Sequence, residues 1–333
     1  MNQSSILVTR SIFPEVLERL RAHFEVESNP DDVSWSPEEL LARLQGKAGV
    51  FTTGVERISG PLLAQCPQLR ICANMTVGYN NFDLDAMTAA GVMATNAPDV
   101  LTETTADFGF ALLMAAARRV VEGEHYLRAG RWKRWSYDML TGAEVNGTTL
   151  GIIGMGRIGQ AIARRAALGF GMQVVYHNRS RLDPATEAQF GARYLSKTEL
   201  LQTSDHVMLV VPYSAASHHT IGAAELALMK PTATLVNIAR GGVVDDGALA
   251  LALREKRIAS AGLDVFEGEP AVHPDLLTVP NVVLTPHIAS ATEGTRRAMA
   301  MVAVDNLVGF LVHGKATTPL NPECLVNQSS PRG

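Results

Sequence analysis

Cysteine and long apolar segments are scarce in this sequence of 333 residues. Its three cysteines (Cys66, Cys72 and Cys324) form no C-x-x-C pair, which argues against a disulfide framework and a thiolate metal site. The longest uncharged apolar run, residues 108–117, covers about ten residues and is too short to span a bilayer. Residues 1–5 show no basic region followed by an apolar stretch, so no signal peptide is expected. These absences favour a cytoplasmic protein.

An excess of basic charge is also missing. The chain has 29 Lys and Arg against 33 Asp and Glu, a formal net charge of −4, so nucleic acid and anionic membranes are not the expected partners. Hydrophobic residues make up 47% and charged residues 19%, which is typical of a folded globular protein rather than a disordered one. At roughly 150 residues a domain, the length predicts two domains.

Short apolar runs alternate with helical patterns in the first hundred residues. We predict strands at Ile6–Thr9, Gly49–Thr52, Ile71–Ala73 and Val92–Thr95. We predict helices at Pro14–Phe24, Pro37–Leu44, Pro61–Cys66 and Leu84–Ala90. Such alternation favours parallel βαβ units over a β-sandwich.

The same alternation restarts after a long apolar segment. A helix is predicted from Thr102 to about Val121, and its apolar residues on nearly every side suggest burial between domains or subunits. Leu127–Val145 has no clear hydrophobic periodicity and is predicted to form a long irregular loop, called the excursion below. Further strands are predicted at Leu150–Ile153, Gln173–Tyr176, Val207–Val211, Thr234–Ile238, Ala261–Val265 and Val282–Leu284. The expected fold class is α/β, with two doubly wound parallel-sheet domains.

A glycine-rich motif lies between a predicted strand and a predicted helix at Gln160–Leu168. Gly154, Gly156 and Gly159 fit G-x-G-x-x-G, in which the glycines permit a tight turn, close approach of a pyrophosphate and close helix–strand packing. The pyrophosphate then lies at the helix N-terminus. A glycine-rich turn without a ligand is the alternative, and the flanking strand and helix favour dinucleotide binding.

The strand after this motif ends without the acidic residue that would hold the ribose 2′-hydroxyl of NAD. Instead it is followed by His177, Asn178, Arg179 and Ser180, with Arg181 next. Arginine can bind a 2′-phosphate through charge-assisted hydrogen bonds, so this loop predicts NADPH as cofactor, with NADH a weaker alternative. A solvated basic loop remains the other interpretation.

Three residues suited to catalysis each follow a predicted strand. They are Arg240, Glu269 and His287, and residues beyond the carboxyl ends of parallel strands face the ligand crevice of such sheets. Taken singly, each has a plain structural explanation: a turn arginine, a solvated acid and a packed or capping histidine.

Taken with the glycine motif, these residues resemble the D-isomer-specific 2-hydroxyacid dehydrogenase family over almost the whole chain. The segments that carry the resemblance are Val77–Asp83, Gly151–Gly159, Asn237–Gly242, Ala261–Pro270 and Thr285–Ser290. Within the family, Val100–Asp107 and Ala117–Glu122 are similar to the glyoxylate/hydroxypyruvate reductases, a group that includes bacterial 2-ketogluconate reductases.

The resemblance implies a domain plan. A Rossmann dinucleotide-binding domain at residues 101–289 would be inserted into a flavodoxin-like substrate domain formed by residues 1–100 and 290–326. The remaining stretch, 327–333, is polar and contains Pro331, so its composition predicts a flexible tail. The resemblance also implies a homodimer, in which the excursion would bring Trp135 and Met139 toward the partner's active site.

The resemblance further implies roles for individual residues. Arg240 would bind the substrate carboxylate together with the backbone amides of Val77 and Gly78. His287 would donate a proton to the 2-oxo oxygen, and Glu269 would favour the charged imidazole. Other cofactor-binding residues would be Thr105, Arg157, Ile158, Val211, Pro212, Ser217, Ile238, Ala239 and Asp264.

The implied activity is the reduction of small 2-oxo acids: glyoxylate, hydroxypyruvate and 2-keto-D-gluconate. Formate dehydrogenases share the fold, but formate oxidation protonates no carbonyl oxygen, so the acid-supported histidine argues against that activity. A dinucleotide-sensing binding protein, like the corepressors that resemble this family, is the alternative from another class.

No metal site is expected. His218 and His219 are adjacent, so on a strand or a helix their side chains would point apart. Asp245 and Asp246 precede an apolar segment and are predicted to begin a helix rather than to form a catalytic pair.

Overall fold

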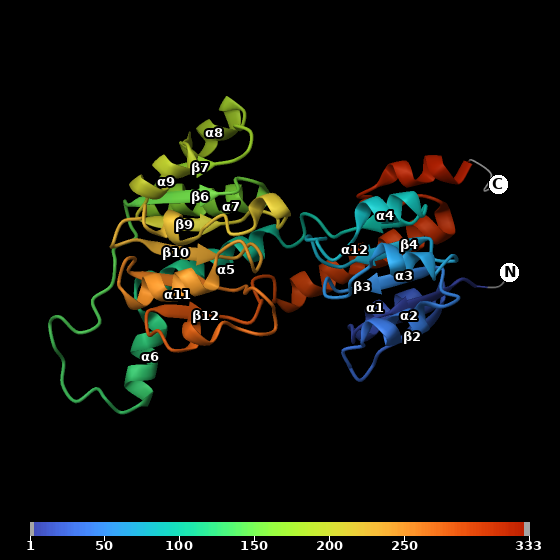
Figure 1. Ribbon diagram of the computed structural model, residues 1–333, viewed down its shortest axis with the longest axis horizontal. Coiled ribbons are helices and arrows are strands. Elements are labelled where there is room, and N and C mark those ends of the chain that lie inside the picture. Colours follow the sequence, from blue (N-terminus) through green and yellow to red (C-terminus); the bar gives the residue numbers. More distant parts are fainter. Residues whose placement is uncertain (1–2, 330–333) are drawn as a thin grey trace. The chain divides into compact units, whose positions relative to one another are not determined.

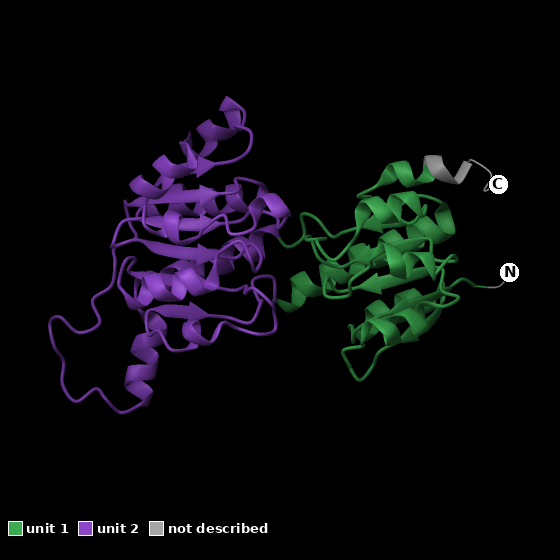
Figure 2. Cartoon of the chain, in the orientation of Figure 1, with its two compact units in different colours: residues 1–101, 292–333 green, residues 102–291 purple. Residues whose placement is uncertain are grey.

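The computed structural model describes residues 3–329 of the chain. The chain divides into two compact units (Figure 2): unit 1 comprises Met1–Leu101 and Thr292–Gly333, and unit 2 comprises Thr102–Ala291. The predicted domains had boundaries after residues 100 and 289. Among the described residues, no helix is both long and apolar enough to cross a membrane.

Unit 1 is built on a five-stranded parallel sheet (Figure 1). Its strands are β1 (Ser5–Val8), β2 (Glu25–Ser28), β3 (Gly49–Thr52), β4 (Ile71–Asn74) and β5 (Met93–Thr95). Its α-helices are α1 (Pro14–Arg21), α2 (Pro37–Leu44), α3 (Gly60–Ala64), α4 (Leu84–Ala89) and α12 (Glu293–His313). The strand order β2-β1-β3-β4-β5 is that of a flavodoxin-like sheet.

Local sequence explains where several of these helices begin. Ser36 and Glu39 form a capping box at the start of α2, and the Asp83 side chain accepts from the Ala86 N–H at the start of α4. Strands β3 and β4 are buried along their whole length, as expected for a parallel sheet covered on both faces. Helix α12 packs against β3 and β4, so the C-terminal part of the chain completes the core of unit 1.

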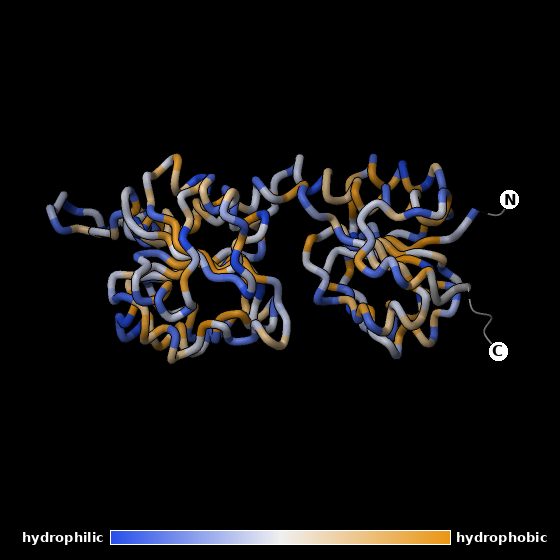
Figure 3. The backbone as a smooth tube through the Cα atoms, turned by 90° about the horizontal axis from the view of Figure 1, so that it is seen from above, coloured by the Kyte–Doolittle hydropathy of each residue, from blue (hydrophilic) through white to orange (hydrophobic). Residues whose placement is uncertain are grey.

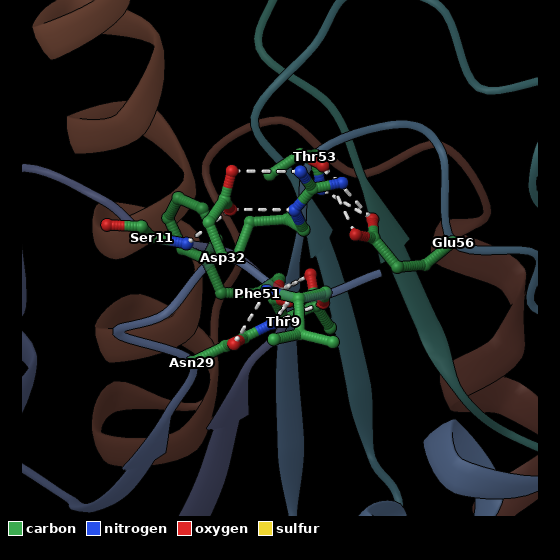
Figure 4. Close-up of polar contacts among 9 residues, drawn as sticks. Thr9, Ser11, Asn29, Asp32, Phe51, Thr53 and Glu56 are labelled. Atoms are coloured by element: carbon green, nitrogen blue, oxygen red, sulfur yellow. Dashed lines mark hydrogen bonds and ion pairs between the residues drawn. The ribbon is translucent and has the colours of Figure 1, made fainter. Parts of the chain in front are cut away.

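Polar side chains tie together the loops at the carboxyl ends of β1, β2 and β3 (Figure 4). The Arg10 guanidinium donates to both carboxylate oxygens of Asp32, at 2.8 and 2.9 Å. The Asn29 side-chain amide donates to the Thr9 carbonyl, and the Thr53 N–H donates to Glu56. These bonds fix the edge of the sheet at which loops that contact ligands normally lie.

Unit 2 is built on a seven-stranded parallel sheet. Its strands are β6 (Thr149–Ile153), β7 (Gln173–His177), β8 (Arg193–Tyr194), β9 (His206–Leu209), β10 (Thr234–Asn237), β11 (Ser260–Leu263) and β12 (Val282–Leu284). Its α-helices are α5 (Thr102–Ala117), α6 (Val120–Arg128), α7 (Arg157–Arg164), α8 (Pro184–Phe190), α9 (Lys197–Thr203), α10 (Ala223–Leu226) and α11 (Asp246–Arg254). The order β12-β11-β10-β9-β6-β7-β8 is that of a Rossmann sheet extended by one strand.

Hydrophobic residues concentrate along the central strands of each unit (Figure 3). In unit 2, separate apolar cores lie on the two faces of the sheet, and α5 packs against α7, β10 and β11. The predicted α/β class, with two doubly wound parallel sheets, is therefore confirmed.

Several local predictions were wrong in detail. The helix predicted from Thr102 to about Val121 is interrupted, because Arg119 adopts a left-handed conformation (φ 54°) between α5 and α6. Strands β2 and β8 were missed. The helix predicted at Gln160–Leu168 is α7 followed by a π-helical segment, Arg165–Gly169. Of the predicted tail, residues 327–329 belong to a 3₁₀ helix, Pro322–Ser329, and residues 330–333 lie outside the described residues.

Candidate active site

His287 lies just beyond the carboxyl end of β12, in the left-handed region with φ 54°. For a residue other than glycine this conformation is uncommon, and surrounding contacts must hold it. Its backbone N–H donates to the Asp264 carbonyl at 2.9 Å. Its ring Nδ1 lies 2.8 Å from Glu269 Oε2, and the two side chains are 46% and 32% exposed. The imidazole is therefore oriented by a carboxylate yet open to solvent.

Asp264 holds the segment that carries His287. Its buried carboxylate accepts three hydrogen bonds, from Thr285 Oγ1 at 2.7 Å and from the backbone N–H groups of Ile288 and Ala289 at 2.9 and 2.8 Å. Burial raises the pKa of Asp264 and outweighs these hydrogen bonds, which act in the opposite direction. The sequence offered no signal for this positioning role, because it depends on contacts across more than twenty residues.

Glu269 is held from the other side by its own loop. Its Oε1 accepts from the Phe266 N–H at 2.9 Å, which leaves Oε2 directed at His287. Burial alone would raise the pKa of Glu269, but the hydrogen bond and charge of His287, with smaller contributions from Phe266 and Arg240, lower it. The Glu269 carboxylate is thus held between the Phe266 backbone and the His287 ring.

Arg240 lies in the turn after β10, and its neighbours define that turn. The Asn237 side chain accepts from the Ala239 N–H and donates to the Arg240 carbonyl. A Cβ on Gly241 would lie only 1.7 Å from the Phe266 carbonyl oxygen, so glycine is required where these two loops cross. Burial lowers the pKa of Arg240, and the nearby charge of Glu269 opposes that shift. Arginine remains cationic in such a site and can bind a carboxylate in a bidentate manner.

The three glycines of the motif meet the steric demands of a dinucleotide site. A Cβ on Gly154 (φ 104°) would lie 2.7 Å from the Val210 backbone, and one on Gly159 would lie 2.4 Å from the Gly154 carbonyl oxygen. A Cβ on Gly156 would meet nothing within 4 Å, so open space adjoins this backbone. Gly156 is also the N-cap of α7, which begins at Arg157 and continues with Ile158, and no side chain caps it. These features fit a pyrophosphate at the helix N-terminus.

The loop after β7 divides into residues tied to the protein and residues open to solvent. His177 Nδ1 lies 2.9 Å from the Leu195 carbonyl oxygen, and Asn178 Oδ1 accepts from the Met155 N–H in the glycine loop at 2.7 Å. Arg179 and Ser180 are exposed, and neither has a polar partner among the residues that the structure describes. Within residues 3–329, these are the two of the four predicted side chains that lack a polar partner.

Arg181 faces a different partner. Its Nε and Nη2 donate to the two oxygens of Glu187, at 2.8 and 2.7 Å, and the buried Tyr176 hydroxyl donates to the same carboxylate at 2.6 Å. The Arg181 hydrogen bond, followed by that of Tyr176, lowers the pKa of Glu187 to about 2. This ion pair links the loop after β7 to α8 and occupies the Nε–Nη2 edge of the Arg181 guanidinium.

Other predicted cofactor residues lie in unit 2 at the same edge of the sheet or on α5. Thr105 of α5 has a buried hydroxyl with no partner in the described protein, as expected if a ligand supplies one. Ile238 and Ala239 are buried beyond β10. The loop after β9 contains Val211, Pro212 and Ser217, and the Ser217 hydroxyl donates to the Pro212 carbonyl at 2.9 Å. The predicted substrate residues Val77 and Gly78 lie in unit 1, in the loop after β4.

The side chains of His218 and His219 do not point apart, contrary to the expectation for adjacent residues on a strand or a helix. Their rings stack with centroids 3.9 Å apart, because His219 lies in a turn with φ 48° rather than in a strand or helix. His218 Nδ1 contacts the Tyr213 hydroxyl, and His219 Nε2 contacts Glu267. Both rings therefore have polar partners within the protein. Asp245, as predicted, caps a helix (α11) by accepting from the Ala248 N–H.

Comparison with known proteins shows the family to which the chain belongs. The family model described as D-isomer specific 2-hydroxyacid dehydrogenase, NAD binding domain, matches residues 110–289. A glyoxylate reductase of Thermococcus onnurineus is 48% identical over 324 residues, 96% of each chain.

Solved structures give the same result. A protein of Thermus thermophilus has a TM-score of 0.87 and 42% identity, covering 95% of this chain and 99% of that one. An NADPH-dependent glyoxylate/hydroxypyruvate reductase of Sinorhizobium meliloti, in complex with NADP and malonate, has a TM-score of 0.85 and 37% identity, covering 97% and 98%. Residues 110–289 therefore form a nicotinamide dinucleotide-binding domain, and the chain is a member of the D-isomer-specific 2-hydroxyacid dehydrogenase family.

Proposed function

We propose that the protein is an NADPH-preferring reductase of small 2-oxo acids, converting glyoxylate to glycolate and hydroxypyruvate to D-glycerate, with 2-keto-D-gluconate as a further substrate. The observation that carries the proposal is the 2.8 Å contact between His287 Nδ1 and Glu269 Oε2. Reduction of a carbonyl needs a proton donor, and this pair is built to supply one. The glyoxylate reductases among its relatives support the choice of substrate class.

Arg240, His287 and Glu269 have different roles in this mechanism. A bound NADPH supplies the hydride. Arg240 binds the substrate carboxylate and polarises the 2-oxo group. His287 donates a proton from Nε2, which has no partner among the described residues, to the oxygen that becomes the hydroxyl. Glu269 stabilises the imidazolium before that transfer and keeps Nε2 directed outward.

Two alternatives predict different chemistry. Formate oxidation leaves no carbonyl oxygen to protonate, so it has no use for a histidine supported by Glu269. A dinucleotide-sensing binding protein can retain the same three residues, and only turnover separates it from an enzyme.

The oligomeric form is part of the proposal. The excursion after α6 exposes large apolar side chains: Trp132 is 53% exposed, Trp135 72% and Tyr137 89%. Burial against a second copy would remove this surface from water, so we propose a homodimer in which Trp135 and Met139 approach the partner's site. Sedimentation should give twice the monomer mass at micromolar concentration, and a monomer would contradict the proposal. The three free cysteines are buried, which is compatible with the proposed cytoplasmic location.

The test is a panel of 2-oxo acids assayed with NADPH and with NADH. We expect kcat/KM to be highest for glyoxylate or hydroxypyruvate with NADPH. Formate with either oxidised cofactor serves as the control and should give no turnover. Cofactor binding without turnover of any 2-oxo acid would instead support the binding protein.

A further inference from the structure

The loop after β4 holds two consecutive peptide groups in one orientation. The Ala97 N–H donates to the Thr76 carbonyl at 3.0 Å, and the Asn96 side-chain amide Nδ2 donates to the Val77 carbonyl at 2.8 Å. Both carbonyls are thus held by the same short segment after β5. Asn96 is only 7% exposed, so the hydrogen bond from its amide is largely shielded from water and is stronger than it would be at the surface.

Because peptide groups are planar, the directions of these two carbonyls also fix the directions of the N–H groups in the same peptides. In a trans peptide the N–H points opposite to the carbonyl, and the Thr76 and Val77 carbonyls belong to the same peptides as the Val77 and Gly78 N–H groups. Both N–H groups therefore point away from the segment of Asn96. Neither has an acceptor among the residues that the structure describes. Two successive N–H groups aimed alike form an anion-binding concavity.

Further bonds hold this arrangement from both sides. Asn74 Nδ2 and the Thr76 hydroxyl both donate to the Gly78 carbonyl, at 2.9 and 2.8 Å. The Asn96 backbone carbonyl in turn accepts from the Thr318 hydroxyl, which also accepts from the buried Asn306 amide of α12 at 2.8 Å. The loop is thereby connected to the C-terminal segment of unit 1, more than two hundred residues away in sequence.

We infer that Asn96 is a positioning residue for substrate binding: its side-chain amide holds the Val77 carbonyl so that the Gly78 N–H, beside that of Val77, faces the carboxylate of a 2-oxo acid. This inference rests on the proposed function. It adds a residue that touches no substrate and acts through the orientation of a peptide group.

The test replaces the donor without changing the shape of the side chain. In the variant Asn96→Asp an oxygen faces the Val77 carbonyl in place of the N–H, and in Asn96→Ala the donor is removed without adding charge. Both should raise the KM for glyoxylate and the Kd of malonate, measured by calorimetry in the presence of NADPH, by about tenfold or more, the usual effect of losing one charge-assisted hydrogen bond. The Kd for NADPH should not change, because the glycine loop lies in unit 2.

A pH profile separates this role from a merely structural one. Protonation of the new carboxyl in Asn96→Asp restores a hydrogen-bond donor. The ratio of the KM of this variant to the KM of the unmodified enzyme should therefore fall toward one as the pH is lowered. The same ratio for Asn96→Ala should not change with pH. Asn80→Asp places the same charge on an exposed residue of the same loop and should leave KM unchanged.

The outcomes are distinct. Native-like melting temperatures with KM within twofold of the unmodified enzyme, for both Asn96 variants, would overturn the inference. If these variants do not fold, Thr318→Val removes the hydroxyl that supports Asn96 and should raise KM more modestly, and an unchanged KM would then refute the inference. An unmodified enzyme that turns over no 2-oxo acid would refute the proposed function instead, and the malonate measurement would still test the role of Asn96.

Discussion

The preference for NADPH should depend on Arg179 and not on Arg181. Both arginines lie in the loop after β7, where a 2′-phosphate is expected, but their surroundings differ. Arg181 is engaged by both oxygens of Glu187, whereas Arg179 is exposed and has no ion pair among the described residues. The Nε–Nη2 edge of Arg181 is thus occupied, and a bidentate bond from that edge to the phosphate would leave the buried Glu187 carboxylate without its cation, which is unfavourable.

The expected size of the NADPH preference follows from the presence in this loop of one arginine, Arg179, that is unpaired among the described residues. A hydrogen bond to a charged group contributes about 1.5–3 kcal/mol, and solvent exposure of Arg179 reduces this to roughly 1–2 kcal/mol. With tenfold in affinity for every ~1.4 kcal/mol, the preference supplied by Arg179 is on the order of tenfold. Two free arginines, as the sequence alone allowed, would give on the order of a hundredfold. The structure therefore lowers the expected preference.

The assay compares kcat/KM for NADPH and NADH in the unmodified enzyme and in two matched variants. Arg179→Ala should lower kcat/KM with NADPH by roughly tenfold and leave that with NADH unchanged, and the difference should shrink as salt screens the phosphate. Arg181→Ala should leave the cofactor preference intact and lower the melting temperature, because Glu187 loses its partner. Equal losses with both cofactors in Arg179→Ala, or a selective loss of NADPH activity in Arg181→Ala, would refute the reasoning.

Three further predictions concern the site and its support. His287→Ala should lower kcat for glyoxylate reduction by about 10²–10⁴-fold while the Kd for NADPH is retained, and near-native kcat would exclude His287 as proton donor. The pKa of Glu187 is lowered from 4.5 to about 2, so its ion pair with Arg181 stabilises the fold fully at pH values above 4.5 and is lost as the pH falls toward 2. The unmodified protein should therefore be more stable than Glu187→Gln at neutral pH, and this difference in the free energy of unfolding, measured with denaturant, should shrink between pH 4.5 and pH 2. Gly156→Ala should leave the melting temperature unchanged, since a Cβ there meets nothing within 4 Å, yet should weaken NADPH binding measured by fluorescence; unchanged binding would show that no pyrophosphate approaches this residue.

Much of the architecture was predictable from local patterns. Apolar runs bounded by turns predicted most of the parallel strands, because a strand buried on both faces needs a continuous apolar segment. The glycine motif was equally recognisable, because its three glycines lie within six consecutive residues between a predicted strand and a predicted helix. Short or exposed elements were not: β2 carries two glutamates and β8 has two residues, so neither shows a buried-strand pattern.

The sequence by itself determined the fold class and the family, and it predicted which residues are suited to hydride-transfer chemistry, because these depend on residue types and short spacings. Tertiary structure alone decided what those residues contact. Asp264 proved to hold the segment of His287 across more than twenty residues, and Arg181 proved to be paired with Glu187 on the next helix. The Val77 carbonyl accepts a hydrogen bond from Asn96, which directly follows the neighbouring strand β5. Periodicity reports which face of an element is buried, whereas such pairings arise only when separate strands and loops pack side by side and each polar group takes the partner within reach.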